Sequence, residues 1–147
     1  MSLKEQLAAD MKDAMKAHDK DRLAVIRMVR GAVRQQEIDG KTELDDNGVI
    51  AVISKEVKMR RDSIDEFKKG NRQDLVDKTQ AEIDVLMPYL PAQLSEDEVR
   101  ELVKAAVEQT GAATAKDMGK VMGVLMPKVK GRADGKMVNT IVKSFLS

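Results

Sequence analysis

The amino-acid sequence predicts an all-α fold, with an N-terminal bundle of about four helices and a small C-terminal domain of three helices. Apolar residues recur every three or four positions along most of the 147-residue chain, which is the spacing of one face of an α-helix. No segment alternates apolar and polar residues for long enough to indicate a strand. Pro88 and Pro91 interrupt the helical pattern. Because proline lacks a backbone N–H, we place a domain boundary there, between residues 1–91 and 92–147.

Four helices are expected in the N-terminal domain. Ser2 and Glu5 have the spacing of a capping box, in which each side chain accepts a backbone N–H at a helix start. Asp19 or Asp21 is expected to cap the second helix. Arg60 falls on an apolar position of the third helix, so we expect it either to extend its charged end to solvent or to form half of a buried ion pair. The expected helices span about 3–16, 19–40, 50–67 and 71–90.

The C-terminal domain begins with a second capping box, at Ser95 and Glu98. A middle helix is expected to end at Pro127, and a basic loop is expected to follow it as far as Gly135. Asp134 is placed to cap the final helix. The apolar side chains expected to point inwards from that helix are Val138, Ile141, Val142 and Phe145.

The composition excludes several kinds of site. The chain has no Cys and a single His, which removes disulfides, thiolate zinc sites, thiol nucleophiles and His-based metal sites. The sequence lacks the motifs of phosphate-binding loops and hydrolase nucleophiles, so we predict no catalytic residue. No apolar run approaches 18 residues, and the first residues lack an apolar signal segment. We therefore expect a cytoplasmic protein with no membrane partner, no metal and no cofactor.

Positive charge gathers in the last part of the chain. Residues 111–147 contain seven Lys or Arg and two Asp or Glu, whereas residues 1–92 contain 17 and 18. A glycine-containing basic loop leads into a helix N-terminus, where free amides and flanking cations attract an anion. The alternative is a solvated surface loop whose glycines serve as turn residues. The candidate nucleic-acid-binding residues are Lys128, Lys130, Arg132 and Lys136, with Lys120 and Lys143 on the neighbouring helices.

Two further patterns have both a structural and a functional interpretation. Arg27, Arg30 and Arg34 share one helix face. We expect them to pair with carboxylates of a neighbouring helix, the alternative being that, together with Arg22, they follow phosphates. Gly119 and Gly123 are four residues apart, and in a soluble helix this spacing is expected to allow close contact with another helix.

The last third of the chain resembles a known family. The run MGKVMGVLMPKVKGRADG over residues 118–135 resembles the signature of the YqeY-like family, and the segments 71–76 and 89–95 resemble that family's central part. The same tail is similar to the C-terminal domain of the GatB subunit of glutamine-dependent Asp-tRNA/Glu-tRNA amidotransferase. The resemblance implies an RNA-contacting tail, carried onto Lys128, Lys130, Arg132, Lys136 and Asn139.

Three functions follow as hypotheses. The first is a non-catalytic tRNA-binding or tRNA-associated accessory protein, which contacts structured RNA through the basic loop. Structured RNA is expected because the chain has only two Phe and one Tyr for stacking on single-stranded bases. The second, implied by the resemblance alone, is a subunit or protein partner in glutamine-dependent tRNA amidation, a carbon–nitrogen ligase reaction with glutamine as the amido donor. The third is a helical protein–protein adaptor.

Overall fold

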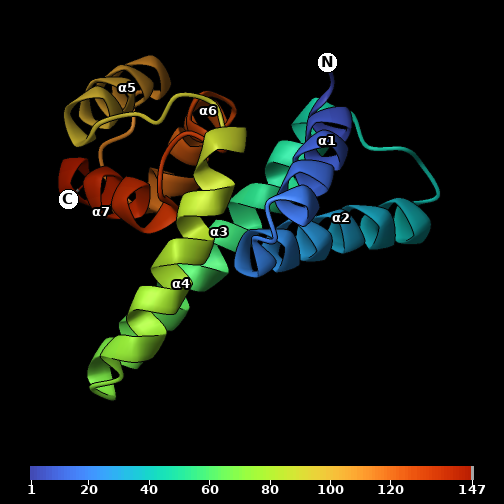
Figure 1. Ribbon diagram of the computed structural model, residues 1–147. Helices are drawn as coiled ribbons and strands as arrows, with labels where there is room; N and C mark the ends of the chain where they lie inside the picture. Colours follow the sequence, from blue (N-terminus) through green and yellow to red (C-terminus); the bar gives the residue numbers. More distant parts are fainter. Residues whose placement is uncertain (147) are drawn as a thin grey trace. The chain divides into compact units, whose positions relative to one another are not determined.

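The computed structural model describes residues 1–146, and this part of the chain is all-α, as the sequence predicts (Figure 1). It forms seven α-helices and two single-turn 3-10 helices, and residues 1–146 contain no strand. The chain divides into two compact units, Met1–Leu90 and Pro91–Ser147, here called unit 1 and unit 2. Each unit has its own cluster of buried apolar side chains.

Unit 1 contains four α-helices whose starts are set by side-chain caps. Ser2 Oγ accepts the Glu5 amide at 3.2 Å, and Asp19 Oδ1 accepts the Arg22 amide at 3.2 Å. The third helix begins earlier than expected, because Asp45 Oδ1 accepts the amide of Gly48 at 2.9 Å and so caps a turn that the polar sequence had suggested was loop. The elements are α1 (Leu3–Lys16), α2 (Lys20–Gly40), α3 (Asp46–Lys69), α4 (Gln73–Leu86) and the 3-10 helix η1 (Met87–Tyr89).

Arg60 of α3 forms the ion pair that was one of its two expected arrangements. Its Nη1 donates to Glu56 Oε2 at 2.8 Å and its Nε donates to Glu82 Oε1 at 3.1 Å. The Arg60 side chain is only 11% exposed. Because Glu82 lies on α4, this pair joins α3 to α4, which pack against each other, through a charge at an otherwise apolar position.

The end of unit 1 is held by Tyr89, which is buried and donates its hydroxyl hydrogen bond to the Asp10 carboxylate of α1. Burial, reinforced by this carboxylate, raises the pKa of Tyr89 above its usual value. The phenol is therefore neutral over the ordinary pH range and acts as a donor. This contact connects residues 79 positions apart in the chain.

Unit 2 contains three α-helices. The expected capping box is confirmed, because Ser95 Oγ accepts the Glu98 amide and Glu98 Oε1 accepts the Ser95 amide, both at 3.1 Å. Gly111 ends the first of these helices with φ +67°, a left-handed conformation that glycine adopts without strain. The elements are α5 (Glu96–Thr110), the 3-10 helix η2 (Ala115–Asp117), α6 (Met118–Val129) and α7 (Gly135–Phe145).

Three expectations for unit 2 are wrong. Pro127 lies inside α6 rather than ending it, because the helical bond from Lys130 N to Met126 O still forms at 2.9 Å beyond the proline. Phe145 is 39% exposed, and Leu146, just after the helix end, is buried in its place. The third concerns the two glycines of α6. A Cβ added at either would meet no atom within 4 Å, so no close helix contact is made there.

Candidate nucleic-acid interface

The basic loop between α6 and α7 is tied to the chain segment that precedes α5. The Leu94 amide donates to the Arg132 carbonyl at 2.7 Å, and Gln93 Nε2 donates to the Gly131 carbonyl at 2.9 Å. Gly131 has φ +75°, a conformation that lets the chain turn sharply here. The short loop is thus fixed by contacts 38 to 40 residues away in sequence.

Arg132 contributes to this anchoring rather than extending into solvent. Arg132 is half-buried as a residue, and its Nε donates to the Ala92 carbonyl at 3.3 Å. The pKa of Glu98 is lowered by its bonds with the Ser95 amide and side chain, and to a smaller degree by the charge of Arg132. Among the predicted site residues, Arg132 is therefore the one whose contacts mainly hold the loop in place.

Lys128 and Lys130 lie at the C-terminal end of α6. Lys128 is in the last turn of the helix, not in the loop as expected, and Lys130 is its C-cap. Both side chains are exposed, and within residues 1–146 neither is paired with a carboxylate. Their position is favourable for cations, because the last carbonyl groups of a helix carry partial negative charge.

Three further predicted residues lie along one face of α7. Lys136, Asn139 and Lys143 are spaced by three and four positions, and all three are exposed. The start of α7 is already capped, because Asp134 Oδ1 accepts the Lys136 amide at 3.2 Å. The capping prediction is confirmed, and an anion at this helix N-terminus would compete with the Asp134 carboxylate.

The exposed face of α6 has little side-chain cover. Gly119 and Gly123 are exposed, and on a helix of 3.6 residues per turn they and Lys130 lie within about 40° of one another. Lys120 is nearby, 72% exposed, with its Nζ 3.9 Å from Asp117 Oδ1. Bare helix backbone is therefore flanked by cations. We call the six residues Lys120, Lys128, Lys130, Lys136, Asn139 and Lys143 the α6–α7 surface.

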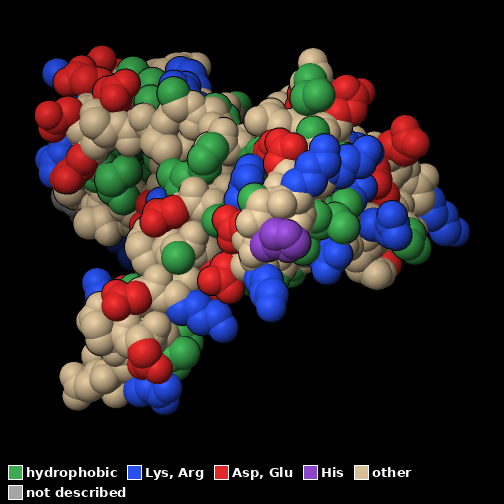
Figure 2. Space-filling view, viewed as in Figure 1, with side chains coloured by type: hydrophobic (Ala, Val, Ile, Leu, Met, Phe, Trp, Pro, Cys, Tyr) green, Lys and Arg blue, Asp and Glu red, His purple; other side chains and the backbone are tan. Residues whose placement is uncertain are grey.

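Charge is unevenly distributed among the helices of unit 2. α5 carries five Asp or Glu and two Lys or Arg over residues 96–110, and its acidic side chains gather on the face seen in Figure 2. The segment 118–146 carries one acid, Asp134, and six Lys or Arg. The basic residues thus lie on different helices from most of the acids of the unit.

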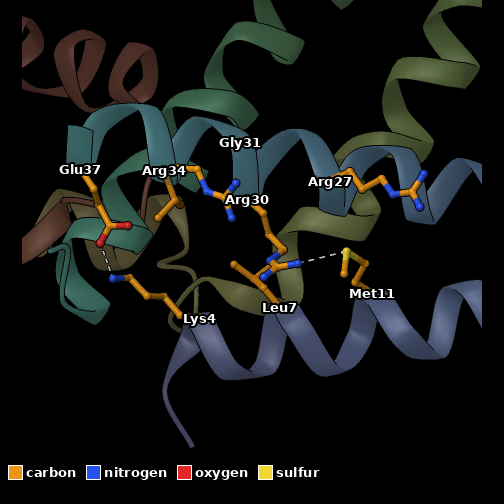
Figure 3. Close-up of a pocket in the computed structure, with 9 residues that line it drawn as sticks. Lys4, Leu7, Met11, Arg27, Arg30, Gly31, Arg34 and Glu37 are labelled. Carbon is orange, nitrogen blue, oxygen red and sulfur yellow. Dashed lines mark hydrogen bonds and ion pairs between the residues drawn. The ribbon is translucent and has the colours of Figure 1, made fainter. Parts of the chain in front are cut away.

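The arginine stripe of α2 does not form the ion pairs expected of it. Within the part of the chain that the structure describes, Arg27, Arg30 and Arg34 form no ion pair within 4.0 Å, although the charge of Arg34 contributes to the lowered pKa of Glu37. Arg30 Nη1 instead donates to Met11 Sδ at 3.2 Å (Figure 3). The three arginines line a pocket of about 300 Å³ between α1 and α2. Its other lining residues are Lys4, Leu7, Met11, Gly31, Val33 and Glu37.

Sequence reasoning missed the residues that complete this pocket. Lys4 and Glu37 form an ion pair at one end of it, although they are 33 positions apart. The spacing of Glu37, three residues after Arg34, continues the same helix face and was the available signal. Lys4 gave no signal, because its partner depends on how α1 packs on α2.

Two kinds of feature are absent from residues 1–146. No three His, Asp or Glu side chains there come together as a group able to hold a metal ion. None of the helices formed by these residues is long and apolar enough to cross a membrane.

The fold and the surface charges define an all-α protein of two units, in which the helices α6 and α7 of unit 2 carry the basic residues. The family model described as "Yqey-like protein" matches residues 4–146. The chain belongs to the YqeY-like family.

Curated fungal relatives share the name "Altered inheritance of mitochondria protein 41, mitochondrial". The protein of Pyrenophora tritici-repentis is 38% identical over 133 residues, which are 87% of this chain and 71% of that protein. The protein of Saccharomyces cerevisiae (strain YJM789) is 31% identical over 95% of this chain and 80% of its own length. The protein of Lachancea thermotolerans is 39% identical over 57% of this chain, and the aligned part covers 46% of that protein.

These names correct one expectation. The sequence suggested a cytoplasmic location, whereas the relatives that cover most of this chain are named as mitochondrial proteins. The prediction was wrong because it relied on the lack of an apolar signal segment, which does not report on entry into an organelle.

Proposed function

We propose that this chain is a non-catalytic accessory protein that binds structured RNA, tRNA in particular, through the α6–α7 surface. The observation that carries the proposal is that Lys128, Lys130 and Lys143 are exposed and, within residues 1–146, are not neutralised by carboxylates. The choice of tRNA rests on the similarity of the tail to the GatB C-terminal domain.

The physical basis is attraction to phosphate. Each Lys that contacts a phosphate displaces condensed counterions from the RNA, so affinity falls as salt rises. The bare backbone at Gly119 and Gly123 leaves space for a bulky sugar–phosphate strand to approach the helix. The acids of α5 would repel the same strand, which favours one orientation of the RNA on unit 2.

The test is a charge reversal with a matched control. The site variant is Lys128→Glu, Lys130→Glu and Lys143→Glu. The control is Lys55→Glu, Lys58→Glu and Lys68→Glu, three exposed lysines of α3 that give the same change in net charge. The Kd for tRNA is measured for each at several salt concentrations.

The site variant is expected to bind tRNA roughly 10- to 100-fold more weakly, and to lose about two to three units of the slope of log affinity against log salt. The control is expected to change the Kd by no more than about threefold, because long-range effects of exposed charges are screened. Equal weakening by both variants, or an unchanged slope in the site variant, would show that the α6–α7 surface is not the RNA interface.

A further inference from the structure

The residues that line the pocket between α1 and α2 in unit 1 carry more positive than negative charge. Arg30 reaches from α2 toward α1, and Arg34 lies one turn along on the side of the Lys4–Glu37 pair (Figure 3). That pair is neutral as a whole, so Arg27, Arg30 and Arg34 leave the pocket with an excess of three positive charges. Like charges three or four positions apart repel one another and destabilise the helix. A bound anion would reduce this repulsion.

The type of cation indicates the type of anion. All three are arginines, whose planar guanidinium groups donate paired hydrogen bonds that match the oxygens of a phosphate. Within residues 1–146, Arg30 donates one side-chain hydrogen bond, to a thioether sulfur, which is a weak acceptor, so its other donors can bind an oxyanion.

The floor of the pocket adds a second requirement. It is apolar, formed by the buried side chains of Leu7 and Val33 and the half-buried Met11. Gly31 also lines the pocket, and a Cβ added there would meet no atom within 4 Å. The volume of about 300 Å³ is at the small end of ligand sites, which suits one nucleotide better than a large cofactor.

We propose that this pocket binds a nucleoside phosphate, with the phosphate held by Arg30 and Arg34 and the ring lying over Leu7 and Met11. The ligand is either a free mononucleotide or one nucleotide of an RNA strand, since both present the same chemistry. This site lies on unit 1 and does not depend on the RNA-binding role of the α6–α7 surface.

The experiment is an NMR titration of the full chain with AMP, with a ten-nucleotide RNA and with inorganic phosphate. The resonances followed are the Gly31 amide and the Nε–H groups of the three arginines. Binding of AMP assigns the pocket to free nucleotides, and binding of the oligonucleotide without AMP assigns it to an RNA strand. The proposal would be overturned if neither AMP nor the oligonucleotide perturbed these resonances. It would also be overturned if inorganic phosphate perturbed them at the same concentration as AMP.

Variants separate the pocket from general charge. Arg30→Gln with Arg34→Gln is expected to weaken binding about tenfold or more, because each loses a charged hydrogen-bond donor. Gly31→Ala is expected to weaken binding while leaving Tm unchanged or higher, so loss of fold does not explain its effect. Lys12→Gln with Lys16→Gln removes two exposed cations of α1 outside the pocket and is expected to change binding by less than about twofold.

The variant Lys128→Glu, Lys130→Glu and Lys143→Glu is expected to keep AMP or oligonucleotide binding at this pocket. That result distinguishes the pocket from the α6–α7 surface. Unchanged binding in the Arg30, Arg34 double variant would contradict the proposal.

Discussion

Glu37 holds together three segments of unit 1. Its carboxylate accepts a hydrogen bond from Lys4 Nζ of α1 and another, at 2.7 Å, from the amide of Leu44 in the loop before α3. The hydrogen bond from Lys4, followed by that from Leu44, holds the pKa of Glu37 below its usual value of 4.5. A carboxyl group with a lowered pKa binds protons less readily in the folded protein than in the unfolded chain.

This shift predicts a pH-dependent contribution to stability. Above pH 4.5, the usual pKa of the carboxyl, the contribution of Glu37 is fully present. This contribution to stability is lost as the pH falls from 4.5 through the lower pKa that Glu37 has in the folded protein. The wild type is therefore expected to have a higher Tm than Glu37→Gln at pH 7, and this difference is expected to shrink toward zero in acid. Thermal unfolding from pH 7 to pH 3 measures it, and a difference that is constant with pH would contradict the assignment.

Arginines show how far sequence patterns determine side-chain roles. Arg60 occupies an apolar position, and that anomaly correctly suggested an ion pair as one of two outcomes. The arginines of the α2 stripe were expected to form ion pairs too, and they form none within residues 1–146. Periodicity assigns a residue to a helix face, but the partner across that face depends on the tertiary packing.

At the scale of a single element, α6 combines features that weaken a helix. It contains Pro127, and its exposed face carries two glycines, each of which disfavours a helix by about 0.5–1 kcal/mol relative to alanine. Because an added Cβ would meet no atom at either glycine, packing does not explain their presence. The proposed RNA interface would give them a role, since the missing side chains leave room for a phosphate backbone.

Gly119→Ala with Gly123→Ala is expected to separate stability from binding. The free energy of unfolding should rise by roughly 1–2 kcal/mol in total, since both positions are exposed and helical. The Kd for tRNA should rise at the same time, because the two methyl groups limit approach to α6. Chemical unfolding and a binding titration of the same preparation test both parts, and a more stable variant that binds tRNA as well as the wild type would refute the role of the glycines.

The starts of α1, α2 and α5 were predicted correctly from their capping residues, whereas the start of α3 was not. Ser2, Asp19 and Ser95 cap their helices through bonds to residues three positions away, so the signal is local in sequence. The end of α6 was misplaced because helical bonds persist beyond Pro127. Phe145 was misassigned because Leu146, outside the helix, takes its place in the core.

Across the whole molecule, the two units have different surface chemistry. Unit 1 is nearly balanced in charge, and its arginine pocket and ion pairs depend on contacts between residues far apart in sequence, such as Lys4 with Glu37. Unit 2 has most of its acids on α5 and its cations on α6 and α7. The basic cluster of unit 2 was predicted from the sequence because its residues are close together along the chain. The anchoring of Arg132 was not predicted, because it depends on Ala92, 40 residues away in sequence.

The central claim is that RNA meets unit 2 on α6 and α7. The most direct measurement is an NMR titration of the full chain with tRNA at low salt, following the backbone amides of unit 2. The account predicts that the perturbed amides cluster at Gly119, Gly123, Lys128, Lys130 and Lys143, and that those of the exposed face of α5 stay unchanged. Perturbations confined to α5, or none in unit 2 at saturating tRNA, would contradict it.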